Sequence, residues 1–148
     1  MAAILDHTHP HHNPLHLRQH PAILTDMHVS NDQFDRYVRQ AIDAFDPRFR
    51  PYLDEVPVIV ENLPSPQLLQ TINLPKGHTL LGLFQGQPLN RRSATTHQLP
   101  SNITLYRQNI LARCHNHKQL AEQIRRTIIH ELGHYLGFSE SQLRHHHY

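Results

Sequence analysis

The stretch HELGHYLGFSE, residues 130–140, carries the clearest chemical signal in this chain. It contains an H-E-x-x-H motif, in which His130 and His134 stand four residues apart. On a helix this spacing places the two imidazoles one turn apart on the same face, where together they can bind one Zn²⁺. Glu131 then lies beside the ion, where its carboxylate can serve as the general base of a metal-dependent hydrolase.

The motif lies near the end of a long helical pattern that runs from residue 116 to residue 136. Apolar residues recur along one side of it at i, i+3 and i+4 spacing: Leu120, Ala121, Ile124, Ile128, Ile129, Leu132 and Leu136. His130 and His134 fall off this apolar side, next to Thr127 and Gln123. Because the chain has 16 His, the competing interpretation is two polar-face histidines on an ordinary amphipathic helix.

A third ligand is predicted just beyond the helix. Gly137 suits a left-handed C-cap that reverses the chain, and Glu140 follows three residues later. Two His and one Glu form a known catalytic zinc set with an open fourth position, so Glu140 is predicted as the third ligand. The alternative is that Glu140 is an N-terminal charge on a last short helix, capped by Ser139 with Gln142 as its capping-box partner.

Composition limits the classes of function. The 148 residues suffice for one domain with a real core. The formal net charge is only +2 and the basic residues are scattered, so no nucleic-acid partner is expected. We expect neither a membrane span nor a signal peptide, because the apolar runs are too short and residues 1–5 lack a basic start. The single Cys114 excludes an internal disulfide and a Cys-cluster zinc site, and it favours a reducing, cytoplasmic location.

Residues 1–29 are predicted to be a flexible, His- and Pro-rich N-terminal extension, followed by one folded domain over residues 30–148. The extension holds seven of the 16 His, interrupted by Pro10, Pro14 and Pro21. Such a composition buries little apolar surface and can bind Zn²⁺, Ni²⁺ or Cu²⁺ weakly. A neutral extension and a metal-handling segment are both compatible with it.

The elements predicted for the domain give an α+β class. A capping box of Ser30 and Gln33 starts a first helix that ends before Pro47. Three strands are predicted, over residues 56–61, 79–85 and 102–107, and Pro57 must lie at an edge or at a strand start. Residues 63–76 and 87–100 are predicted to be connections, and residues 109–116 a turn of helix before the motif helix.

Several segments together resemble the small bacterial zincin-like metallopeptidases, also called minimal zincins. They are VIVE at 58–61, LGLFQG at 81–86, LP at 99–100, ITLYR at 103–107 and HELGHYLGFSE at 130–140. The resemblance runs from about Phe34 to Leu143 and leaves the His-rich start outside. It implies a small twisted mixed sheet of about three to four strands, packed against an N-terminal helix and the H-E-x-x-H helix.

The resemblance also implies roles for the motif residues. His130 and His134 are expected as zinc ligands, Glu131 as the base, and an acidic residue at position 140. The family usually has Asp there, and Glu140 is one methylene longer.

The sequence therefore predicts a Zn²⁺-dependent metallopeptidase that acts on a peptide or protein substrate. Two alternatives stay open: a zinc-stabilised peptide-binding module without catalysis, and a metal-handling protein that uses its His-rich N-terminus. Residues 81–85 are expected either as an exposed edge strand that pairs with an extended peptide or as an ordinary internal strand. The sequence predicts no oligomeric state.

Overall fold

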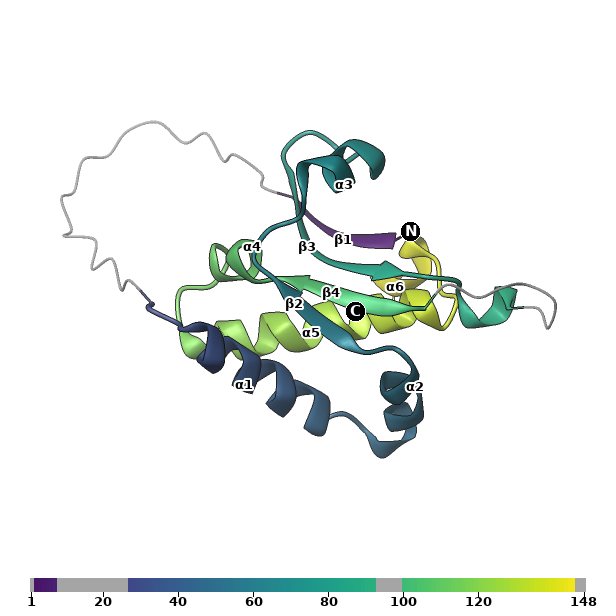
Figure 1. Ribbon diagram of the computed structural model, residues 1–148, viewed down its shortest axis with the longest axis horizontal. Coiled ribbons are helices and arrows are strands. Elements are labelled where there is room, and N and C mark those ends of the chain that lie inside the picture. The colour runs from purple at the N-terminus through teal and green to yellow at the C-terminus, as the bar shows by residue number, and fades with distance from the viewer. Residues whose placement is uncertain (1, 8–26, 93–99, 146–148) are drawn as a thin grey trace.

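The computed structural model describes residues 2–7, 27–92 and 100–145 (Figure 1). The helices of this part are α1 (Asn31–Asp43), α2 (Arg50–Glu55), α3 (Pro66–Thr71), α4 (Arg107–Leu111), α5 (His117–Tyr135) and α6 (Glu140–His145). The strands are β1 (Ala2–His7), β2 (Val58–Glu61), β3 (His78–Gln85) and β4 (Asn102–Tyr106). Two short 3-10 helices, η1 (Pro47–Phe49) and η2 (Leu89–Arg91), complete the elements.

The strands form one mixed sheet in the order β1-β3-β4-β2. β3 pairs antiparallel with β1 on one side and with β4 on the other, whereas β4 and β2 are parallel. β3 is therefore an internal strand, so the second of the two readings of residues 81–85 describes it. Its outer edge is taken by β1, which comes from the first residues of the chain.

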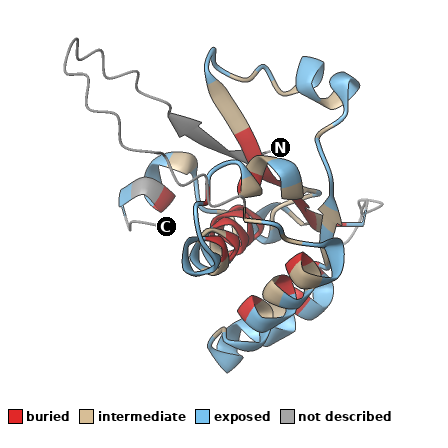
Figure 2. Cartoon of the chain, turned by 90° about the vertical axis from the view of Figure 1, so that its left-hand side faces the viewer, coloured by how far each residue is buried: buried red, intermediate tan, exposed pale blue. Residues whose placement is uncertain are grey.

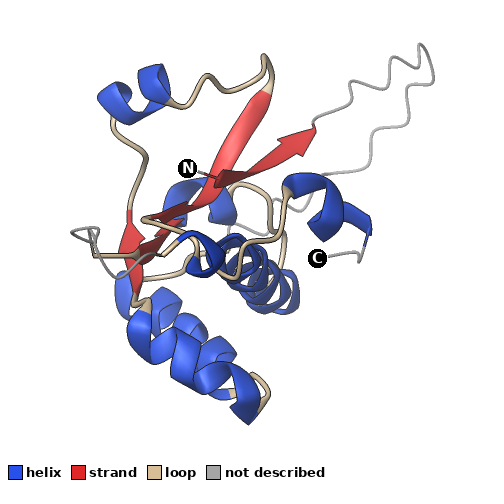
Figure 3. Ribbon diagram, turned by 90° about the vertical axis from the view of Figure 1, so that its right-hand side faces the viewer, coloured by secondary structure: helices blue, strands red, loops and turns tan. Residues whose placement is uncertain are grey.

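The main core lies between the sheet and the two long helices. α5 lies along one face of the sheet and α1 packs against α5, and Figures 2 and 3 show this layering. Figure 2 shows buried residues along α5 and on one side of α1. Most positions of β4 and the central positions of β3 are buried as well. A smaller cluster, formed by Leu80, Leu83 and Tyr106 with three apolar residues around α3, covers the opposite face. Because both faces are covered, the central residues of β3, from Leu80 to Phe84, are buried.

The structure confirms the α+β class and the mixed sheet. It also confirms the capping box at the start of α1, where the Ser30 hydroxyl accepts from Gln33 N and the Gln33 side chain accepts from Ser30 N. Pro57 directly precedes the edge strand β2, as predicted. The region predicted as a connection over residues 63–76 contains α3, which Ser65 caps through a hydrogen bond to Leu68 N. Six residues are too short for a helical periodicity to stand out, and α2 was missed for the same reason.

The predicted extension falls largely outside the described residues, which omit residues 1 and 8–26. Within it, residues 2–7 form β1 and pair with β3, whereas the sequence predicted no strand there. The division of the chain at residue 30 stays a prediction. Among the described helices, none has the length and apolar character needed to cross a bilayer.

A glycine inside β3 allows α5 to approach the sheet closely. A Cβ placed on Gly82 would lie 2.6 Å from Thr127 Cγ2 and 3.3 Å from Glu131 Cγ, both on α5. Glycine in a strand interior normally weakens the strand, and it is retained where another part of the chain must come close. Gly82 thus sets the separation between the motif helix and the sheet.

We expect Gly82→Ala to destabilise the fold by about 1–3 kcal/mol, because the added methyl group overfills this contact. Urea denaturation measures the loss. Thr127→Ser removes the clashing Cγ2 and keeps the hydroxyl that donates to Gln123 O. The double variant should therefore be more stable than Gly82→Ala alone, and purely additive effects would contradict the assigned contact.

Candidate metal centre

The whole motif lies in the last turns of α5, and its residues are buried. Asn116 caps the helix by accepting from Gln119 N, and the buried positions run continuously from His130 to Tyr135. His130 and His134 are each only 6% exposed. This burial argues against the competing interpretation of two polar-face histidines on an ordinary amphipathic helix.

The chain reverses direction after α5, as predicted from Gly137. Gly137 has a φ of 94°, in the left-handed region that favours glycine. Phe138 N donates to Gly133 O and Gly137 N donates to His134 O, which together form a Schellman motif. This turn directs the following segment back toward the histidines.

The segment after this turn begins α6 with a capping box of its own. Ser139 N donates to the Gln142 side chain, and Gln142 N donates to the Ser139 hydroxyl at 3.4 Å. Glu140 is the first residue of α6. The helix-start interpretation of Glu140 is correct, and it does not compete with the ligand interpretation, because the same cap positions the carboxylate.

A second glycine sets the position of α6. A Cβ on Gly133, inside the motif, would lie 2.4 Å from Leu143 Cδ2 of α6. Leu143 is buried, so it has little room to move aside. The missing side chain of Gly133 thus lets α6 pack directly on α5 and hold Glu140 over the motif.

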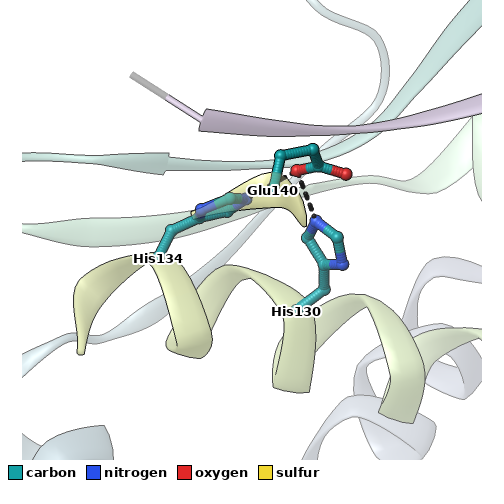
Figure 4. Close-up of side chains that lie close together, drawn as sticks. All are labelled: His130, His134 and Glu140. Atoms are coloured by element: carbon teal, nitrogen blue, oxygen red, sulfur yellow. Dashed lines mark hydrogen bonds and ion pairs between the residues drawn. The ribbon is translucent and has the colours of Figure 1, made fainter. Parts of the chain in front are cut away.

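Three side chains converge at this junction, and Figure 4 shows them pointing toward one another. Glu140 Oε2 lies 3.1 Å from His130 Nε2 and 3.2 Å from His134 Nε2. Within the described residues these three form the group of His, Cys, Asp and Glu side chains that could hold a metal ion. Zinc bonds of about 2.0–2.1 Å at tetrahedral angles place neighbouring ligand atoms about 3.3 Å apart, so the two oxygen–nitrogen distances fit that ion. All three ligand atoms lie within 4.8 Å of one another.

The hydrogen bonding of His134 supports the same fit. Its Nδ1 lies 3.2 Å from Phe138 O; a carbonyl only accepts, so Nδ1 carries the proton and Nε2 presents a lone pair. That buried Nε2 has no hydrogen-bond partner within the described part of the chain, although a carboxylate oxygen lies nearby. Burial, and secondarily the neighbouring His130, lowers the pKa of His134, which favours the neutral, metal-binding form. The lone pair of His134 Nε2 and the Glu140 carboxylate would repel each other, and a cation bound between them would turn this repulsion into attraction.

Glu131 has a different environment from the three converging residues. Its side chain is fully buried and its Oε2 accepts a 2.7 Å hydrogen bond from Phe84 N on β3. Because a buried carboxylate needs such partners, this bond fixes the group under the sheet. The structure thus places Glu131 between α5 and β3, next in sequence to His130.

A cleft of about 730 Å³ opens beside the converging residues. Its walls come from α3, the end of β3, the η2 segment and the turn between α5 and α6, and they include Leu83, Phe84, His134 and Glu140. The side chain of Glu140 is 40% exposed, so the group is reached from this side. A cleft of this volume accommodates a small ligand or a few residues of a peptide.

Sequence reasoning named the converging residues and Glu131, but it missed two features that position Glu131. Gly82 could have been found, because a glycine between apolar strand residues signals a close approach. The role of the Phe84 N–H has no such signal in the sequence. Every non-proline residue has a backbone N–H, and only the fold determines which of them meets Glu131. The α3 wall of the cleft was missed together with α3 itself.

These features define an α+β domain with a candidate metal centre built on an H-E-x-x-H helix. The sequence model of the zincin-like metallopeptidase family matches residues 53–148, about two thirds of the chain. The chain therefore belongs to the zincin-like metallopeptidase family, which implies a metal and peptide or protein substrates. Among curated proteins, none matches it.

We expect Gly133→Ala to weaken divalent-metal binding at this group by roughly tenfold, about 1.4 kcal/mol, because α6 must shift and take Glu140 with it. Competition of Zn²⁺ with a chromophoric chelator measures the affinity. Leu143→Val removes the δ-methyl groups that the new Cβ would meet. The double variant should regain affinity, and an unchanged affinity in Gly133→Ala would show that α6 does not position the carboxylate.

Proposed function

We propose that this protein is a zinc-dependent peptidase, with His130, His134 and Glu140 as the metal ligands and Glu131 as the general base. One observation carries the proposal: a carboxylate oxygen of Glu140, on α6, lies 3.1 and 3.2 Å from two imidazole nitrogens of the helix that bears the family's motif. Two His and one Glu leave a fourth position for water or substrate.

The bound ion would polarise a peptide carbonyl and make a water molecule acidic enough to attack at neutral pH. The chain's own residues supply the remaining functions. Glu131 accepts the proton of the attacking water and passes it to the leaving amine. The Phe84 N–H holds the Glu131 carboxylate in one orientation, and the Phe138 carbonyl does the same for the His134 ring.

A zinc-stabilised peptide-binding module is the second candidate, and one observation favours it. Glu131 has no exposed surface, whereas a general base must reach its water and substrate. A module of this kind would keep the metal and the cleft but leave peptides intact. The third possibility, metal handling by the His-rich N-terminus, concerns residues outside the described ranges.

We expect His134→Ala to abolish tight zinc binding, lowering affinity by more than the roughly 10–100-fold that loss of an outer-shell partner costs. Mass spectrometry of the native protein and chelator competition measure stoichiometry and affinity. His115→Ala, at an exposed histidine before the other end of α5, is the matched control and should retain about one tightly bound zinc. Full zinc affinity in His134→Ala would refute the ligand assignment.

We expect Glu131→Gln to retain zinc and the fold while kcat for peptide hydrolysis falls by about 10²–10⁴, the usual contribution of a general base. The amide oxygen of Gln can still accept the Phe84 N–H. Chelator-sensitive digestion of a peptide library, followed by mass spectrometry, measures turnover. If the wild-type protein cleaves nothing under conditions where it binds zinc and peptides, the binding module is the better description.

A further inference from the structure

The strand β1 covers one edge of β3, and the direction of the Phe84 N–H shows which edge this is. Phe84 lies opposite Ile103 in the antiparallel pair of β3 and β4, and Ile103 N donates to Pro57 O, on the β2 side of β4. Residues opposite each other in such a pair direct their N–H groups either toward each other or both away. The Phe84 N–H therefore faces the other edge of β3, which is the edge that β1 covers.

This edge is also the one nearest the candidate metal centre. Ala2 and Ala3 of β1 lie opposite Phe84 and Leu83, and both of these β3 residues line the cleft with His134 and Glu140. Figure 4 shows the purple ribbon of β1 passing over the three converging side chains. β1 also lies close to α5.

The β1 segment is separate from the part of the chain that defines the family. The family match begins at residue 53 and includes β3, β4, α5 and α6, whereas β1 lies before it. Without β1, the sheet order is β3-β4-β2, and β3 becomes an edge strand beside the metal centre. An edge strand of this kind can add an extended peptide through backbone hydrogen bonds.

The pairing of β1 with β3 is interrupted at the site itself. The register shifts between Ala3 and Leu5, where two steps along β1 match three along β3, from Leu83 to Leu80. Between these two pairs β3 has two residues, Leu81 and Gly82, where β1 has one. The side chain of Glu131 packs against Gly82. Bulges of this type loosen the ladder locally and are common next to active sites.

We propose that residues 2–7 act as a built-in competitor, occupying as β1 the edge of β3 that an extended peptide substrate takes. This inference rests on the proposed function, because it names the binding mode of that same site. It also accounts for the fully buried Glu131: with β1 in place the carboxylate is covered, and displacement of β1 opens the edge at which it lies. A segment of the same chain competes at an effective concentration on the order of millimolar, so a free peptide must bind well to replace it.

The variant Leu5→Pro/Asp6→Pro tests the proposal in the full chain. Neighbouring residues of a strand direct their N–H groups to opposite edges, so one of the two substituted residues donates toward β3. Proline has no N–H, and the double substitution therefore removes that donor. Leu5→Ala/Asp6→Ala is the matched control, because it changes the same side chains but keeps both N–H groups.

The readout is binding of a fluorescent, N-acetylated peptide with the sequence of residues 2–7, followed by anisotropy in the presence of a chelator. The chelator removes turnover, so binding is scored independently of peptidase activity. We expect the proline variant to bind the peptide at least tenfold more tightly than the wild type and the alanine variant. The same peptide with proline at positions 5 and 6 should not bind. Equal affinity for wild type and proline variant, with both folded by circular dichroism, overturns the proposal.

A locked variant covers the case in which the proline variant does not fold. Asp6 lies opposite Thr79, so Asp6→Cys/Thr79→Cys can tie β1 to β3 by a disulfide. The oxidised form should bind no peptide and the reduced form should bind as the wild type does; undiminished binding by the oxidised form contradicts the proposal.

Hydrolysis by the same variants separates this inference from the proposed function. If peptide binding depends on β1 but no variant cleaves the peptide, the role of β1 as a competitor is supported and the peptidase activity is refuted. If the wild type, the proline variant and the oxidised locked variant all cleave the peptide with the same kcat/KM, the peptidase activity is supported and the role of β1 as a competitor is refuted.

Discussion

The close approach of α5 to β3 at Gly82 is the constraint on which the rest of this structure depends. A side chain at that position would meet Thr127 and Glu131 of α5, so the helix can lie this close only over a glycine. The approach brings the Glu131 carboxylate within 2.7 Å of Phe84 N. One packing contact thus determines where the proposed base lies relative to the sheet edge.

A second constraint, at the other face of α5, completes the candidate metal centre. Gly133 lets α6 pack against the motif helix, and Gly137 reverses the chain between the two helices. Both glycines are needed to bring Glu140 from a separate element to within 3.1–3.2 Å of the two imidazoles. The longer Glu side chain fits this geometry, because its Oε2 lies almost equally far from both nitrogens.

The parts of the fold that could be predicted are those that depend on local chemistry. The Ser30–Gln33 box, the periodicity of α5 and the αL position at Gly137 are written in short stretches of sequence, and the structure has each of them. The proximity of Glu140 to the histidines was predicted from the motif's layout, since the turn leaves few other paths. The Phe84 N–H and the pairing of β1 could not be predicted, because both depend on contacts between residues far apart in the chain.

The position of β1 changes how the buried carboxylate should be understood. A fully buried acidic side chain is costly unless hydrogen bonds or ion pairs compensate for its burial, and the Phe84 N–H donates one such hydrogen bond to Glu131. A protein that needed Glu131 for stability alone could place an apolar residue there at no such cost. Its position beside two imidazoles and an interrupted strand pairing agrees with the proposed role, which would begin when the edge opens. On this view β1 and a substrate are alternatives for one set of backbone groups, and the buried state of Glu131 belongs to the closed form of the site.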